Sequence, residues 1–179
     1  MSAWSAPERP RRPSTAGERE SLEAFVDHHR ATLLVTCAGL TPEQLASRSC
    51  PPSTLSLLGL VRHMAEVERN WFRRVLDRQE APPIFYSPEN PDGDFDDVDP
   101  TRVDEDLAVY QAEVAAAREV AARYELGRVG HWRHAGQDVS LRWIYVHMIE
   151  EYARHNGHAD LLREMIDGRT GERASTADP

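Results

Sequence analysis

The sequence predicts an all-α protein, built as a bundle of four long helices. Apolar residues recur at intervals of three and four along four separate segments, as they do on the buried face of an amphipathic helix. No stretch shows the alternation expected of a series of strands. Loops rich in proline or glycine separate the four segments, which is the organisation of a helical bundle.

The first expected helix covers about residues 17–37 and is ended by Gly39. A short helical turn follows, with Thr41 as its N-cap residue. The second long helix should begin at residue 53 or 54, where a serine and a threonine offer caps, and end at about residue 78. The apolar stripe of this second helix comprises Leu57, Leu60, Val61, Met64, Val67, Trp71 and Val75.

After a proline-rich loop over residues 81–100, a third helix is expected from about 103 to 124. Residues 127–138, which include Trp132, are expected to be irregular. The fourth helix covers about residues 140–167, and Gly168 provides its C-terminal stop. One folded domain over residues 17–168 is therefore expected between a disordered lead, residues 1–16, and a disordered tail, residues 169–179.

The composition argues against several classes of protein. The net charge of −9 disfavours a nucleic-acid-binding protein, which usually has a basic face. All 21 basic residues are arginine, so lysine Schiff bases, pyridoxal phosphate attachment and a P-loop lysine are excluded. No segment approaches the roughly 20 apolar residues of a membrane span, and the N-terminus does not resemble a secretory signal. Two cysteines without a CxxC pair are too few for a disulfide framework, and a cytoplasmic protein is expected.

The fourth expected helix carries a row of titratable side chains. His147, Glu151 and His155 are spaced i, i+4 and i+8, so they share one face, and His158 lies near it. Apolar residues flank this face and indicate that part of it points into the bundle. Buried polar groups need partners, and a divalent metal would supply one, because imidazole and carboxylate are its usual ligands.

A metal site in a bundle takes ligands from facing helices, so the second helix should also contribute one. His63 lies on its apolar stripe, and His63, Glu151 and His155 are therefore the candidate ligands. Zinc or nickel is the expected metal, although iron accepts the same donors. Three protein ligands would leave open positions, as in a catalytic site. The alternative is that His63 hydrogen-bonds to a protein neighbour, while the fourth-helix histidines are solvated or cap the helix.

Two segments carry a family resemblance. Residues 53–72, with His63 and Glu66, and residues 143–158, with Glu151 and His155, resemble the DinB-like superfamily. This superfamily includes mycothiol-dependent maleylpyruvate isomerase and thiol S-transferases, and the sequence resembles an actinobacterial subgroup within it. The resemblance covers about residues 18–168 and implies an up-down-down-up four-helix bundle. It also implies a metal bound at the positions of His63, Glu151 and His155.

The resemblance implies a cofactor and an activity as well. Characterised relatives use the metal to bind a low-molecular-weight thiol as thiolate, and mycothiol is the thiol expected here. The implied protein is an S-transferase or isomerase acting on a small electrophile, with Glu66 or His158 moving a proton. Relatives often have Arg-Gly-Gln after the last ligand, where this sequence has Asn156-Gly157-His158, so the role of His158 stays open.

The alternative function is a non-catalytic metal-binding or stress-response protein. An arginine-lined cavity beside the metal would favour the enzyme, because thiol cofactors with polar tails need such anchors. The expected partners are a thiol and a small electrophile, with no nucleic acid and no membrane, and a homodimer is left open.

An acidic run occupies residues 89–106, with nine carboxylates and one arginine. Asp92, Asp94 and Asp96 briefly match a calcium loop. Asp97 and Val103, however, stand at the sixth and twelfth positions, where such a loop has glycine and glutamate. We interpret the run as a solvated loop that shapes the mouth of the pocket.

Overall fold

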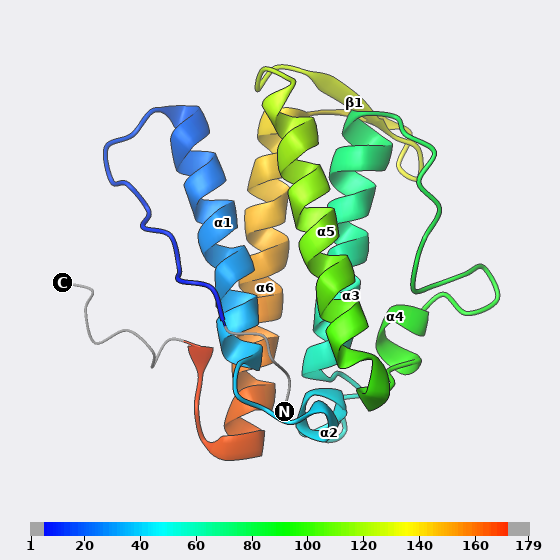
Figure 1. The fold of residues 1–179 in the computed structure, drawn as a ribbon. Helices are drawn as coiled ribbons and strands as arrows, with labels where there is room; N and C mark the ends of the chain where they lie inside the picture. The colour runs from blue at the N-terminus through cyan, green and yellow to red at the C-terminus, as the bar shows by residue number, and fades with distance from the viewer. Residues whose placement is uncertain (1–5, 172–179) are drawn as a thin grey trace.

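A computed structural model describes residues 6–171 and confirms the helical bundle. Its long helices are α1 (Glu18–Cys37), α3 (Leu57–Glu68), α5 (Val103–Ala122) and α6 (Leu141–Asp167). The π-helix η1 (Arg69–Leu76) continues α3 without a break. Figure 1 shows that α1 and α6 run in one direction while α3 and α5 run in the other, which is the up-down-down-up order.

Local signals at the helix ends are largely confirmed. The short helix α2 (Pro42–Ala46) begins with a capping box between Thr41 and Gln44. Gly168 ends α6 in the left-handed region, with φ of 76°. The expected start of the second helix at residue 53 or 54 was wrong. Ser56 is the N-cap instead, because its hydroxyl accepts the N–H of Gly59.

Two segments expected to be loops contain short regular elements. The segment 81–100 includes α4 (Gly93–Asp96) and runs into the 3₁₀ helix η2 (Pro100–Arg102). The segment 127–138 was expected to be irregular, but most of it lies in a hairpin of β1 (Val129–Trp132) and β2 (Gln137–Ser140). Gly130 lies so close to the backbone of η1 that a Cβ there would be 2.8 Å from Leu76 Cα. These strands depend on pairing and close packing, and they are too short to show a period in sequence.

One buried hydrogen-bond network joins all four long helices. Arg30 on α1 donates to both oxygens of Glu68 on α3, at 2.7 and 2.6 Å. The hydroxyl of Tyr152 on α6 donates to Glu68 at 2.7 Å and lies 3.0 Å from that of Tyr110 on α5. Each of these side chains is almost completely buried. A buried charge of this kind requires its partners, so the network ties the helices into one arrangement.

The lead predicted over residues 1–16 is described from residue 6 onward. There it has no helix or strand, and the carbonyl oxygen of Pro10 lies 3.0 Å from Nδ1 of His28 on α1. Residues 1–5 and 172–179 lie outside the described residues, so the disorder predicted for them stays a prediction. Within residues 6–171, no helix is long and apolar enough to cross a membrane.

Candidate metal centre

His63 on α3 is held by a carboxylate that reaches it from α4. Nδ1 of His63 lies 2.8 Å from Oδ2 of Asp94, and the Asp94 side chain is only 8 % exposed. When Nδ1 donates to the carboxylate, Nε2 carries the lone pair and is free to bind a metal. The ring of Phe95 stacks on the imidazole at 4.7 Å between centroids. A carboxylate behind the imidazole is the usual way to fix the orientation of a metal-binding histidine.

The short helix α4 is fixed in turn by the residue before His63. Arg62 donates to the backbone carbonyls of Gly93 and Asp94 and forms a buried ion pair with Asp106 at 3.2 Å. Gly93 lies against the chain at Phe85, where a Cβ would come within 2.5 Å of the carbonyl oxygen. Two adjacent residues of α3 therefore contact α4, since Arg62 holds its backbone and His63 hydrogen-bonds to the carboxylate of Asp94. The interpretation of the acidic run as a solvated loop was wrong for Asp94, which is buried.

Glu151 and His155 lie one turn apart on α6, across from His63. The imidazole rings of His63 and His155 are 4.8 Å apart between centroids. Oε2 of Glu151 is 3.5 Å from Nε2 of His155. One ligand atom from each of His63, Glu151 and His155 can be chosen so that all three lie within 4.8 Å of one another. No other cluster of this kind occurs among residues 6–171.

This donor set fits a divalent cation. Two donor atoms of a tetrahedral ion with bonds of about 2.1 Å lie about 3.4 Å apart, so metal binding would draw the most widely spaced donors of the triad together by about 1 Å or somewhat more. Hydrogen bonding to His147 and His155 holds the pKa of Glu151 well below its usual range, so it is a carboxylate at neutral pH. The three residues therefore offer two imidazoles and one anionic oxygen, which suit zinc, nickel or iron.

His147 lies beside this triad. Its Nε2 is 3.3 Å from Oε1 of Glu151, the oxygen other than the one near His155. Its ring stacks on Trp143 at 4.9 Å and meets the edge of Trp71 at 4.5 Å. His147 is therefore placed to orient Glu151 from the side opposite His155.

The π-helix η1 explains how Trp71 reaches α6. In an uninterrupted α-helix, side chains eight residues apart, such as His63 and Trp71, would point about 80° apart around the axis. The wider turns of a π-helix rotate less per residue, which brings Trp71 back towards the face that carries His63. Both side chains consequently contact histidines of α6. Trp71 also packs against Trp132 of the hairpin, at 5.1 Å between centroids.

The two expected proton carriers have different surroundings. Nδ1 of His158 is 3.4 Å from Nδ1 of His155, so His158 adjoins the triad. Glu66 is buried, and its Oε1 accepts the N–H groups of Ile84 and Phe85, at 2.5 and 2.7 Å. Its Oε2 is buried without a hydrogen-bond partner among the described residues. Burial raises the pKa of Glu66. The catalytic roles of both residues stay predictions.

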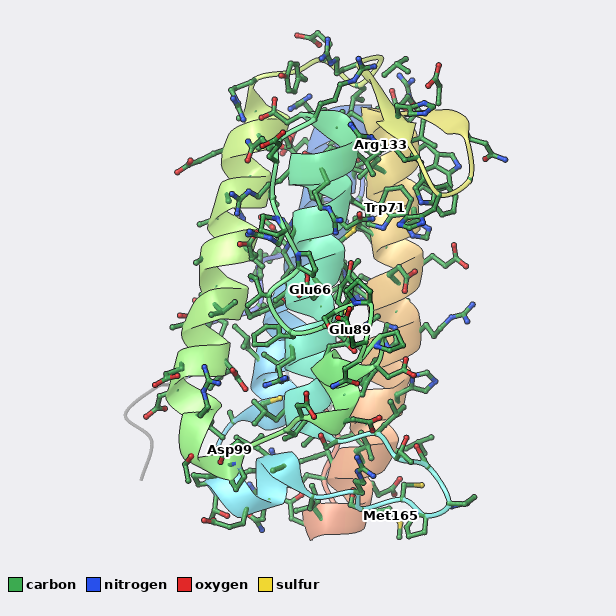
Figure 2. The ribbon with its side chains drawn as sticks, turned by 90° about the vertical axis from the view of Figure 1, so that its right-hand side faces the viewer. Glu66, Trp71, Glu89, Asp99, Arg133 and Met165 are labelled. Atoms are coloured by element: carbon green, nitrogen blue, oxygen red, sulfur yellow. The ribbon has the colours of Figure 1, made fainter. Side chains whose placement is uncertain are left out.

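An arginine-lined cavity opens at the hairpin end of the bundle. Its volume is about 430 Å³, and it lies between η1 with the residues that follow it and the β1–β2 hairpin. The basic and aromatic lining residues are Arg74, Arg78, His131, Trp132, Arg133 and His134. Trp132 packs on Trp71, Trp71 packs on His147, and His147 lies 3.3 Å from Glu151, so three side-chain contacts lead from the cavity lining to the triad. Figure 2 shows Arg133 and Trp71 on the face of the bundle that also carries the loop with Glu89.

Comparison with known proteins identifies the family. The family model described as Mycothiol-S-transferase matches residues 21–168. This chain belongs to the mycothiol-S-transferase family. Membership confirms the resemblance to DinB-like proteins and implies a thiol partner and a small-molecule substrate. Searches of curated proteins and of solved structures returned no match.

Sequence reasoning missed two features of the site. Asp94 was interpreted as part of a solvated acidic loop, and no spacing in the sequence indicated that it would contact His63. Trp132 was placed in an irregular segment and Trp71 in an apolar stripe, and nothing in their spacing showed that they would meet. The contact of His63 with Asp94 joins residues 31 positions apart, and that of Trp71 with Trp132 joins residues 61 positions apart. Contacts over such separations leave no periodic pattern in the sequence.

Proposed function

We propose that this protein is a divalent-metal-dependent S-transferase that joins a thiol of the mycothiol type to a small electrophile. The observation that carries the proposal is the convergence of His63, Glu151 and His155, with Asp94 behind His63, in a member of this family. Zinc or nickel is the proposed metal. When bound there, it would lower the pKa of a thiol ligand, so that thiolate is present at neutral pH.

In the reaction, a carbon–sulfur bond forms and the bond from that carbon to its leaving group breaks. The thiol proton leaves the sulfur, and it passes to the leaving group where that group departs as a strong base, or to solvent where it departs as a stable anion. We propose His158 as the carrier, because it lies beside His155 and is only partly exposed. Glu66 is the second candidate. Its bonds to Ile84 and Phe85 support a role in holding the loop over residues 77–92, in addition to or in place of proton transfer.

The protein's own sulfur is not the proposed nucleophile. Cys37 is 1 % exposed, and burial raises the pKa of its thiol to about 12. A thiol in such surroundings is almost entirely protonated at neutral pH and is shielded from a substrate. We therefore propose that a separate thiol provides the attacking sulfur, and the Cys50→Ser variant tests the one partly exposed cysteine of the described residues.

The test is metal analysis of the purified protein together with a thiol-consumption assay, with mycothiol, bacillithiol or glutathione and a generic electrophile. Glu151→Ala and His155→Ala should each lose metal and activity together, while Cys37→Ser and Cys50→Ser should keep both. If His155→Ala keeps full metal occupancy, the proposed ligand set is wrong.

The non-catalytic function is distinguished in the same assay. A wild-type protein that binds metal stoichiometrically but consumes none of the three thiols would be a metal-binding protein. A cysteine variant that is inactive with its metal intact would assign the attacking sulfur to the chain itself.

A further inference from the structure

The arginine-lined cavity differs in charge from the rest of the protein. The chain has a formal net charge of −9, yet Arg74, Arg78 and Arg133 line this one cavity against a single acidic residue, Glu80. Arg74 donates to the neutral hydroxyl of Tyr86 at 3.1 Å. Within residues 6–171, none of the three arginines forms an ion pair with a carboxylate. Among the described residues, no carboxylate is therefore paired with these three positive charges.

Two segments far apart in the sequence place these arginines. Arg78 follows η1 in the left-handed region, with φ of 56°, an uncommon conformation for a residue with a side chain. Arg133 lies in the turn of the hairpin. The hairpin can approach the backbone of Val75 because Gly130 has no Cβ, which would collide there. Residues held in such conformations tend to occur where function requires them. The cavity is thus built by the two segments together.

A cluster of indole rings lies between the cavity lining and the metal centre. Trp132 lines the cavity and packs at 5.1 Å on Trp71 and at 6.2 Å on Trp143. Trp71 and Trp143 in turn contact His147, and Nε2 of His147 is 3.3 Å from Oε1 of Glu151. Indole faces favour flat apolar groups, whereas the polar tail of a thiol cofactor would gain little from them. The combination of arginines and indoles therefore favours a flat, anionic molecule.

We infer that the cavity is a subsite for the electrophilic substrate, which carries a carboxylate or phosphate on a flat conjugated or aromatic body. The anionic group lies among Arg74, Arg78 and Arg133, and the flat body lies against Trp132, towards the metal centre. Arginine suits this task because its planar guanidinium binds carboxylate and phosphate through paired hydrogen bonds. That the ligand is a substrate depends on the proposed S-transfer. That the cavity binds a flat anion does not depend on it.

Binding is tested on the full-length protein without any thiol, with 2-naphthoate as the anionic probe and 2-naphthamide as its neutral counterpart. The Arg78→Gln/Arg133→Gln double variant should bind 2-naphthoate about tenfold more weakly than the wild type, as expected for losing two exposed charges. Its affinity for 2-naphthamide should not change. Arg48→Gln is the matched control, because this exposed arginine lies near α2 at the opposite end of the bundle from the hairpin. Calorimetry and ligand-observed NMR give the dissociation constants.

Three results would overturn the inference. The wild type could fail to bind 2-naphthoate at millimolar concentration, the double variant could bind it as tightly as the wild type, or both probes could lose affinity equally. In a transfer assay, the double variant should raise the KM of a carboxylated electrophile and leave that of the thiol unchanged. A raised KM for the thiol alone would make the cavity the anchor of the thiol. If 2-naphthoate binds as expected but no thiol is transferred, the site stands and the proposed function fails.

Discussion

Replacing Asp94 by asparagine should weaken divalent-metal binding about tenfold without unfolding the protein, while Asp94→Ala should weaken it up to about a hundredfold. Asp94 is 8 % exposed and lies 2.8 Å from Nδ1 of His63, so water hardly screens the contact. Asparagine keeps the shape and one acceptor oxygen but loses the negative charge. A tenfold loss corresponds to about 1.4 kcal/mol, and alanine, which removes the acceptor as well, should lose about twice that.

The measurement is competition between the metal-free protein and a chromophoric zinc chelator, with circular dichroism to check the helices. Asp96→Asn is the matched control, because Asp96 belongs to the same short helix but is 52 % exposed and pairs with Arg48. It should bind zinc like the wild type. If Asp94→Asn and Asp94→Ala both keep wild-type affinity with intact helices, Asp94 does not orient a metal ligand, and the role assigned to it here is wrong.

Three further predictions concern the bundle. Glu68→Ala leaves the buried charge of Arg30 without its main partner and should lower the free energy of unfolding by about 3–5 kcal/mol in urea, whereas exposed Glu105→Ala should change it by less than about 0.5 kcal/mol. Burial raises the pKa of Cys37 from 9.0 to about 12, so Cys37 should resist alkylation at pH 9 while Cys50 reacts. The free energy of unfolding should fall as the pH rises above 9, because Cys37 loses its proton more readily in the unfolded chain. Chelation of the metal should lower Tm without unfolding the bundle, since the helices have their own core, and an unfolded metal-free protein would contradict this.

The sequence by itself determined the helices and the local part of the site. Four amphipathic stripes predict four long helices because the period of an apolar stripe is a local property of the chain. The capping box at Thr41 and the stop at Gly168 are equally local, since each involves only neighbouring residues. Glu151 and His155 share a face for the same reason, because residues one helical turn apart must do so.

Only the tertiary structure decided which side chains meet across the bundle. Asp94 reaches His63 because Arg62 holds α4 against α3, and no periodicity records that contact. The ring contacts of Trp71 depend on the altered turn of η1, and the arginine-lined cavity depends on a hairpin that forms only by pairing and packing. Sequence patterns report the spacing along one element, whereas the site is completed by contacts between elements, whose relative positions are fixed by the packing of the whole core.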